Sequence, residues 1–141
     1  MPVDRLFMDA ALRAQVRERA ANVCEYCHLP QVFAPFPIFH IEHIRARKHG
    51  GATEQSNLCL ACSFCNLHKS SNLSGIDPET DEIVRLFHPR TDRWDEHFEF
   101  RWPPIIGRTA IGRVTVAVLD MNDDERLELR KELGGESVAL H

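Results

Sequence analysis

Residues 24–27 read Cys-Glu-Tyr-Cys, residues 62–65 read Cys-Ser-Phe-Cys, and 34 residues separate the two pairs. Two residues between paired cysteines let one tight turn present both sulfurs to the same ion, and Zn²⁺ takes four ligands in a tetrahedron. The separation exceeds that of most zinc ribbons, but the cost of closing a loop grows only logarithmically with its length. The spacing therefore predicts a structural zinc site around an inserted substructure. Its expected ligands are Cys24, Cys27, Cys62 and Cys65.

The number of cysteines supports a metal site over disulfides. The chain has five cysteines, four of them in CxxC pairs, and its start carries no secretory pattern. This usage is typical of a reducing compartment, where thiolates bind metal. Two alternatives stay open: buried or redox-active pairs, and a mixed ligand set that uses Cys59, His28 or His68. Cys59 is more typical of a small buried thiol.

The composition is that of a globular protein. Hydrophobic residues make up 43% and charged residues 27% of the 141 residues, and no apolar run approaches the length that crosses a membrane. The first 16 residues carry four charged side chains and lack a signal-peptide core, which predicts a cytoplasmic protein. We expect one domain over residues 1–141, with a core at 24–70 and a C-terminal cover at 71–141.

The charge distribution restricts any nucleic-acid surface to the middle of the chain. The formal net charge is −4, which argues against indiscriminate binding of polyanions. Between His40 and Ser70, however, four basic side chains stand against two acidic ones, and four histidines add to them. We expect these basic side chains to contact a phosphate backbone. They are Arg45, Arg47, Lys48 and Lys69.

Local patterns predict mixed helices and strands. Apolar residues at spacings of three and four indicate an N-terminal helix, and the proline-rich stretch 29–37 indicates an irregular connection. A strand, a glycine turn, a second strand or irregular return, and a helix then follow, with a possible short helical turn at 57–62. The expected ranges are 9–23 for the first helix, 38–44 for the first strand, 48–51 for the turn and 66–72 for the second helix.

The C-terminal half predicts further strands and helices. Asp77-Pro78-Glu79-Thr80-Asp81 is typical of a hairpin turn, and another strand is expected at 97–102. Residues 109–120 fit a strand or a helix, and the recurrence of apolar residues every four positions favours the helix. The last helix is expected to be capped by Asn122, with Glu125 three residues later as in a capping box.

Four polar residues, three between the two cysteine pairs and one directly after the second pair, point to a known family. Glu42-His43 ends the first expected strand, Asn57 follows fourteen residues after His43, and Asn66 stands directly after the last cysteine. Together with the paired CxxC sequences, this pattern resembles the HNH endonuclease family over residues 24–70. The family usually has Asp at the position of Glu42 and often His at that of Asn66, so the chain looks like an HNN variant.

The resemblance implies a fold and a reaction. It implies an α+β fold with a small ββα-metal core stapled by a four-cysteine zinc site, beneath an N-terminal helix and a C-terminal strand and helix cover. It also implies an endonuclease that hydrolyses DNA phosphodiester bonds with Mg²⁺ or Mn²⁺. His43 would be the general base, Glu42 and Asn66 would hold the divalent ion, and Asn57 would brace the loop. The chemistry agrees, since imidazole accepts protons near neutral pH and oxygen ligands suit hard cations.

Other interpretations remain at this stage. The chain could be a catalytically inactive, zinc-stabilised nucleic-acid-binding module, or an interaction domain with a structural zinc. His40 shares the expected strand face of Glu42, so it is either a metal or substrate contact or an ordinary surface or packing residue. Adjacent strand residues point to opposite faces, so Glu42 and His43 can serve one phosphate only at a strand end or distortion.

Overall fold

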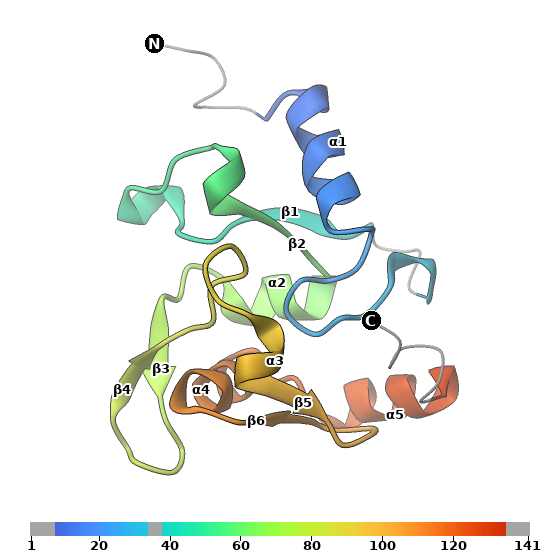
Figure 1. Cartoon of the computed structure of the whole chain (residues 1–141), viewed down its shortest axis with the longest axis vertical. Helices are drawn as coiled ribbons and strands as arrows, with labels where there is room; N and C mark the ends of the chain where they lie inside the picture. Colours follow the sequence, from blue (N-terminus) through green and yellow to red (C-terminus); the bar gives the residue numbers. More distant parts are fainter. Residues whose placement is uncertain (1–7, 34–37, 135–141) are drawn as a thin grey trace.

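The computed structural model describes residues 8–33 and 38–134 as helices and three small antiparallel sheets (Figure 1). This confirms the predicted α+β class. No helix in these ranges is long and apolar enough to cross a membrane. The strand pairs are β1 (His40–His43) with β2 (Leu58–Ala61), β3 (Ser74–Ile76) with β4 (Ile83–Arg85), and β5 (Phe98–Phe100) with β6 (Ile105–Gly107).

The N-terminal helix α1 (Ala10–Arg19) begins where its sequence supplies a cap. The Asp9 carboxylate accepts a hydrogen bond from the Leu12 backbone N–H at 2.8 Å, which satisfies one of the donors that a helix start leaves unpaired. The helix ends at Arg19, before the predicted residue 23, because Ala21 and Asn22 take positive φ angles and turn the chain. Part of the predicted irregular connection, residues 34–37, lies outside the described residues.

The central unit has the predicted order of strand, turn, strand and helix. β1 and β2 pair with Glu42 opposite Cys59 and His43 opposite Leu58. Two short 3-10 helices, η3 (Arg47–His49) and η4 (Gln55–Asn57), shape the connection, and all of β2 is buried. The possible helical turn at 57–62 is therefore absent from residues 58–61, which form a strand, while Asn57 ends η4. Helix α2 (Ser63–Lys69) follows, and Figure 1 shows α1 and α2 on opposite sides of the hairpin.

The C-terminal half packs beneath this unit. It contains α3 (Trp94–His97), α4 (Ala110–Val118) and α5 (Asp124–Leu133) besides the two remaining sheets. The favoured helix at 109–120 is thus confirmed as α4, which packs against β3, β4 and β6 because its apolar residues repeat every four positions. The predicted cap of the last helix is wrong by one residue. Asp123 caps α5, while the Asn122 amide bonds both backbone groups of Ile105.

Aromatic residues join the two halves of the molecule. The indole N–H of Trp94 donates to the carbonyl of Tyr26 at 2.8 Å, and its ring stacks on His28 with centroids 4.0 Å apart. Phe87 and Phe98 are buried and pack edge to face at 5.1 Å. Such pairs contribute beyond the area that they bury. The C-terminal half is therefore packed directly against the turn of the first cysteine pair, residues 24–27.

A buried ion pair fixes the β3–β4 hairpin to α4. The Asp77 side chain has no exposed surface, and its oxygens accept from Arg113 Nε at 3.0 Å and Nη2 at 2.8 Å. The Glu79 backbone N–H and the Thr80 hydroxyl donate to the same carboxylate. These hydrogen bonds, with that of Arg113 the strongest, lower the pKa of Asp77 to about 2.

This pKa shift predicts a pH-dependent contribution to stability. Because the folded pKa lies below the unfolded value of about 3.9, the contribution is complete above about pH 4 and disappears as the pH falls toward 2. Asp77→Asn should therefore lower the free energy of unfolding at pH 7, and its difference from the wild type should shrink below pH 4. Urea unfolding at several pH values measures this. Glu79→Gln is the matched control, because Glu79 is mostly exposed.

Candidate functional site

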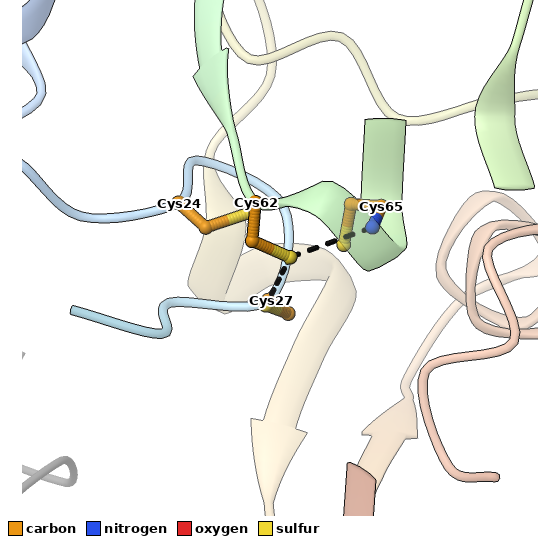
Figure 2. Close-up of side chains that lie close together, drawn as sticks. All are labelled: Cys24, Cys27, Cys62 and Cys65. Carbon is orange, nitrogen blue, oxygen red and sulfur yellow. Dashed lines mark hydrogen bonds between the residues drawn. The ribbon is translucent and has the colours of Figure 1, made fainter. Parts of the chain in front are cut away.

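Four cysteine side chains meet in the interior, as Figure 2 shows. Their sulfur atoms all lie within 4.8 Å of one another, every one is buried, and none forms a disulfide. The sulfurs of Cys27 and Cys62 are 3.7 Å apart. A tetrahedral zinc with Zn–S bonds of about 2.3 Å requires sulfurs about 3.8 Å apart. The cluster therefore fits the predicted zinc site. Its members are Cys24, Cys27, Cys62 and Cys65.

Two backbone features present these sulfurs. The first pair sits in a turn in which the His28 N–H donates to the Cys24 carbonyl at 2.9 Å and His28 takes a positive φ. The second pair stands at the start of α2, where the Cys65 N–H donates to the Cys62 sulfur at 3.4 Å. Among the described residues, the cluster contains none of the alternative ligands that the sequence left open. Cys59 instead faces Glu42.

Arg126 of α5 contacts the cluster and could not be identified from the sequence. Its guanidinium donates to the Cys65 sulfur at 3.0 Å and to the Leu119 carbonyl at 2.7 Å, and it lies over the Phe64 ring. Burial lowers the pKa of Arg126, but the negative charge of Cys65 and its neighbours outweighs this effect and raises the pKa overall. Arg126 would therefore offset part of the negative charge that four thiolates carry when they bind zinc.

His43 ends β1 at the edge of the hairpin. It is half-buried, and its Nε2 lies 2.8 Å from the hydroxyl of Thr53 in the connection to β2. Burial and, second, the charge of Arg47 lower the pKa of His43. The imidazole is therefore mainly neutral at pH 7. No sequence signal indicated Thr53, because this contact arises from the folding of the loop.

Glu42 points to the other face of β1, as strand alternation requires. It is 7% exposed, its Oε2 accepts from the Cys59 thiol at 3.6 Å, and its Oε1 lies 3.8 Å from the Lys69 ammonium. Oε1 has no hydrogen-bond partner among the described residues. Burial raises the pKa of Glu42 to about 7, although the charge of Lys69 opposes the shift. Glu42 thus lies on the face that α2 covers.

Asn66 and Lys69 occupy successive turns of α2. Asn66 is half-buried, whereas Lys69 is only 1% exposed. The Lys69 ammonium donates to the Ile44 carbonyl at 2.8 Å and pairs with Glu42. This burial contradicts the prediction that Lys69 contacts a phosphate on the surface. Its ammonium instead ties the end of β1 to α2.

The other predicted basic contacts lie at the surface. Arg45, Arg47 and Lys48 are exposed on and beside η3, and the Arg45 guanidinium donates to the His49 carbonyl at 2.6 Å. His40 is also exposed. Four arginines of the C-terminal half differ, since each of these four has a carboxylate partner. These pairs are Arg85 with Asp92, Arg90 with Glu25, Arg93 with Glu96 and Arg101 with Glu99.

Asn57 braces the connection between β1 and β2. Its Oδ1 accepts from the Arg45 N–H at 2.9 Å, and its Nδ2 donates to the carbonyls of Arg45 and Ala52. The backbone of Gly51 passes so close that an added Cβ would lie 1.7 Å from the Arg45 carbonyl oxygen. The glycine turn and the Asn57 amide therefore hold the loop that carries Arg45 and Thr53.

Removing this amide should loosen the loop without unfolding the protein. Asn57→Ala deletes three exposed hydrogen bonds, so we expect the free energy of unfolding to fall by about 1–2 kcal/mol. Ser56→Ala, at the exposed neighbouring position, should change it by less than about 0.5 kcal/mol. Urea denaturation at pH 7 measures both. Equal stability of the two variants would refute the bracing role.

A second group of side chains that could ligate a metal joins α2 to the connection between α4 and α5. Its members are His68, Asp120 and Asp123, whose ligand atoms lie within 4.8 Å of one another. The Asp123 carboxylate is already engaged as the cap of α5. Asp120 is exposed.

Comparison with known proteins agrees with the sequence pattern. Residues 24–72 match the family model of the HNH endonuclease. The match begins at the first cysteine of the cluster and ends just after α2, so it includes the β1–β2 hairpin and the four cysteines. No curated protein and no solved structure matches the chain. The predicted resemblance is thus confirmed for this segment.

Proposed function

We propose that this protein, whose residues 24–72 match the HNH endonucleases, is a metal-dependent endonuclease that hydrolyses phosphodiester bonds of DNA. One observation carries the proposal. A single hairpin and helix, held by the four-cysteine cluster, combine a neutral imidazole with a buried carboxylate that faces the helix of Asn66. The family match and this combination of residue types support the same reaction.

His43 would act as the general base. Its lowered pKa keeps the imidazole able to accept a proton at neutral pH. When Nε2–H donates to the Thr53 hydroxyl, Nδ1 keeps its lone pair and can take the proton of an attacking water. Thr53 would then fix the ring orientation as a positioning residue, and Asn57 would support it by holding the loop.

Glu42 and Asn66 would hold the divalent ion. The Oε1 atom of Glu42 is buried without a hydrogen-bond partner among the described residues, as expected of a ligand oxygen. Carboxylate and amide oxygens suit Mg²⁺ or Mn²⁺. When bound, such an ion would supply positive charge that stabilises the reacting phosphate and the leaving oxygen. Burial raises the pKa of Glu42, and the charge of Lys69 opposes this larger effect by favouring the ionised form that the role needs.

Arg45, Arg47 and Lys48 would position the DNA backbone. They are exposed on the connection that follows His43, so a phosphate held there would lie beside the imidazole. Phosphate contacts fix the register of a strand but carry no sequence information. We therefore assign these residues to affinity and placement rather than to the choice of a target sequence.

A second candidate function is a DNA-binding module without catalysis. The Lys69 ammonium lies 3.8 Å from Glu42, and this positive charge would oppose a divalent cation at the same carboxylate. Glu42 would then be a structural partner of Lys69. The exposed basic loop, which carries Arg45, Arg47 and Lys48, would still bind DNA.

Nicking of a supercoiled plasmid separates the two functions. The zinc-loaded protein is assayed with Mg²⁺ or Mn²⁺ added or withheld, and chelators are avoided because they would also remove zinc. Nicking that requires the added ion supports the endonuclease. Salt-sensitive binding without nicking supports the module. Absence of salt-sensitive DNA binding would overturn both.

A further inference from the structure

A cleft of about 260 Å³ opens beside the proposed catalytic unit. It lies where β1 ends, and residues from both halves of the chain line it. The hairpin and α2 contribute Ile44, Arg45 and Lys69, and the region around β4 contributes Leu86 and Phe87. The C-terminal half thus forms one wall of a space that borders the exposed basic loop.

The floor and walls of the cleft are mainly apolar. Ile44, Leu86 and Phe87 are buried side chains that face this space, and Leu73 adds a partly exposed apolar wall. An apolar lining with a few polar groups is typical of sites that take small organic groups. Drug-sized ligands occupy clefts of about 300–1,000 Å³, so this smaller cleft suits a single ring system.

The charges around the cleft argue against a phosphate inside it. No acidic residue of the described ranges lines the space, and two of its cations already have carboxylate partners. Lys69 pairs with Glu42, and Arg85 binds Asp92 through two hydrogen bonds of 2.7 and 3.0 Å. Only Arg45 among the lining cations lacks a carboxylate partner within the described residues, and it belongs to the exposed loop.

Neutral polar groups at the rim suit the edge of a nucleobase. His88 lines the cleft, and its Nδ1 accepts from the Arg90 backbone N–H at 3.1 Å, so the neutral ring carries its proton on Nε2. Burial lowers the pKa of His88, which favours this neutral form. The exposed Asn72 offers an amide with both donors and an acceptor. Such groups pair with the hydrogen-bonding edges of an unstacked base.

We infer that the cleft receives one unstacked base of a nucleic-acid strand whose phosphates lie on the loop of Arg45, Arg47 and Lys48. The inference rests on the proposed function, which it deepens by giving the C-terminal half a part in substrate binding. The strand would cross from the basic loop to β4, with its phosphates outside and one base turned into the apolar space. Leu73 and Asn72 would be specificity-determining residues at its entrance.

Binding of two strands with identical phosphates tests this inference. The full-length, zinc-loaded protein carries His43→Ala, so that no strand is cleaved. The probes are a twelve-nucleotide single-stranded DNA and an abasic strand of equal length. Because stacking of a base contributes roughly 1–3 kcal/mol, we expect the base-bearing strand to bind about ten-fold more tightly in fluorescence anisotropy. Equal affinity for both strands would overturn the inference.

Variants of two exposed leucines assign the preference to the cleft. Leu73→Glu places a carboxylate in the apolar wall, whereas Leu67→Glu places the same charge on an exposed face of α2 outside the cleft. The introduced carboxylate repels the phosphates of both strands equally, so this effect cancels in the ratio of the two affinities. We expect Leu73→Glu to reduce the ratio to about one and Leu67→Glu to preserve it. An unchanged ratio in Leu73→Glu would contradict the inference.

Further outcomes keep this test separate from that of the proposed function. If Leu73→Glu does not fold, Asn72→Ala replaces it, since Asn72 is exposed, and a reduced ratio is again expected. A wild type that nicks plasmid but binds both strands equally would overturn the cleft alone. If the wild type does not nick plasmid but prefers the base-bearing strand, and Leu73→Glu abolishes this preference, the result would support the cleft and overturn the endonuclease.

Discussion

His43→Ala should lower the rate of Mg²⁺-dependent nicking by about a hundred- to ten-thousand-fold, the range that a general base contributes. The physical reason is the loss of the proton acceptor at the end of β1. The protein should stay folded, because the side chain is half-buried and, within the described part of the chain, it forms one hydrogen bond, to Thr53 at the edge of the loop. Single-turnover cleavage with the protein in saturating excess measures the rate without a contribution from binding.

A matched histidine tests whether the effect belongs to position 43. His49→Ala removes an exposed imidazole from the same connection, and within the described residues only the backbone groups of His49 form hydrogen bonds. We expect this variant to cleave within a few-fold of the wild-type rate. If both variants lose activity equally, His43 contributes as part of a basic surface and not as the base.

Cys62→Ser should abolish stoichiometric zinc binding and with it the stable fold. Cys62 is buried, its sulfur belongs to the four-thiolate cluster, and it also accepts the Cys65 N–H at the start of α2. Structural zinc contributes about 10–16 kcal/mol in small zinc-binding peptides, whereas whole domains are stable by about 5–15 kcal/mol. We therefore expect loss of the cooperative thermal transition in circular dichroism, and zinc well below one equivalent.

Cys59→Ser provides the comparison for this experiment. Cys59 is equally buried, three residues away, but its thiol donates to Glu42 and lies outside the cluster. This variant should keep one zinc per chain and a cooperative transition, with at most a moderate loss of stability. A Cys62→Ser protein that melts like the wild type, or a Cys59→Ser protein that loses zinc, would contradict the four-cysteine assignment.

The four-cysteine cluster and the order of the central strands and helix could be predicted because both depend on short local patterns. Each CxxC turn is a property of four adjacent residues, and the sequence of strand, turn, strand and helix follows from short patterns. The glycine turn is also a feature that a short local pattern predicts. Gly50 takes a φ of +84°, and Gly51 passes against the Arg45 carbonyl, so both positions have a backbone reason for glycine.

The orientation of the polar side chains could not be predicted in the same way. A strand places Glu42 and His43 on opposite faces, but only the packing of α2 determines that the Glu42 face is buried. Lys69 was misassigned for this reason, since a lysine at the end of a short helix is usually exposed. Thr53 reaches His43 because the loop folds back, and Arg126 contacts the cysteine cluster from a helix that is distant in sequence. Neither contact follows from a repeating pattern of residues, so the sequence did not indicate them.

The helix cap at the C-terminal end illustrates a competition between equivalent residues. Asn122 and Asp123 are both good caps by residue type. Asn122 is used instead to bond the N–H and carbonyl of Ile105, which secures β6 against the α4–α5 connection. The N-cap of α5 is therefore Asp123, one residue later, whose side chain accepts from the Arg126 N–H. Tertiary hydrogen bonding decided between two positions that local propensity could not distinguish.

The central claim is that a hard divalent ion and the His43 imidazole meet beside one phosphate, and its most direct test is the position of a bound Mn²⁺. Crystals of the zinc-loaded protein are soaked in Mn²⁺, and the ion is located by its anomalous scattering. We expect a peak within about 2.5 Å of oxygens of both Glu42 and Asn66, at the end of β1 that carries His43. Mn²⁺ held only by His68, Asp120 and Asp123, with Glu42 still paired to Lys69, would contradict the claim.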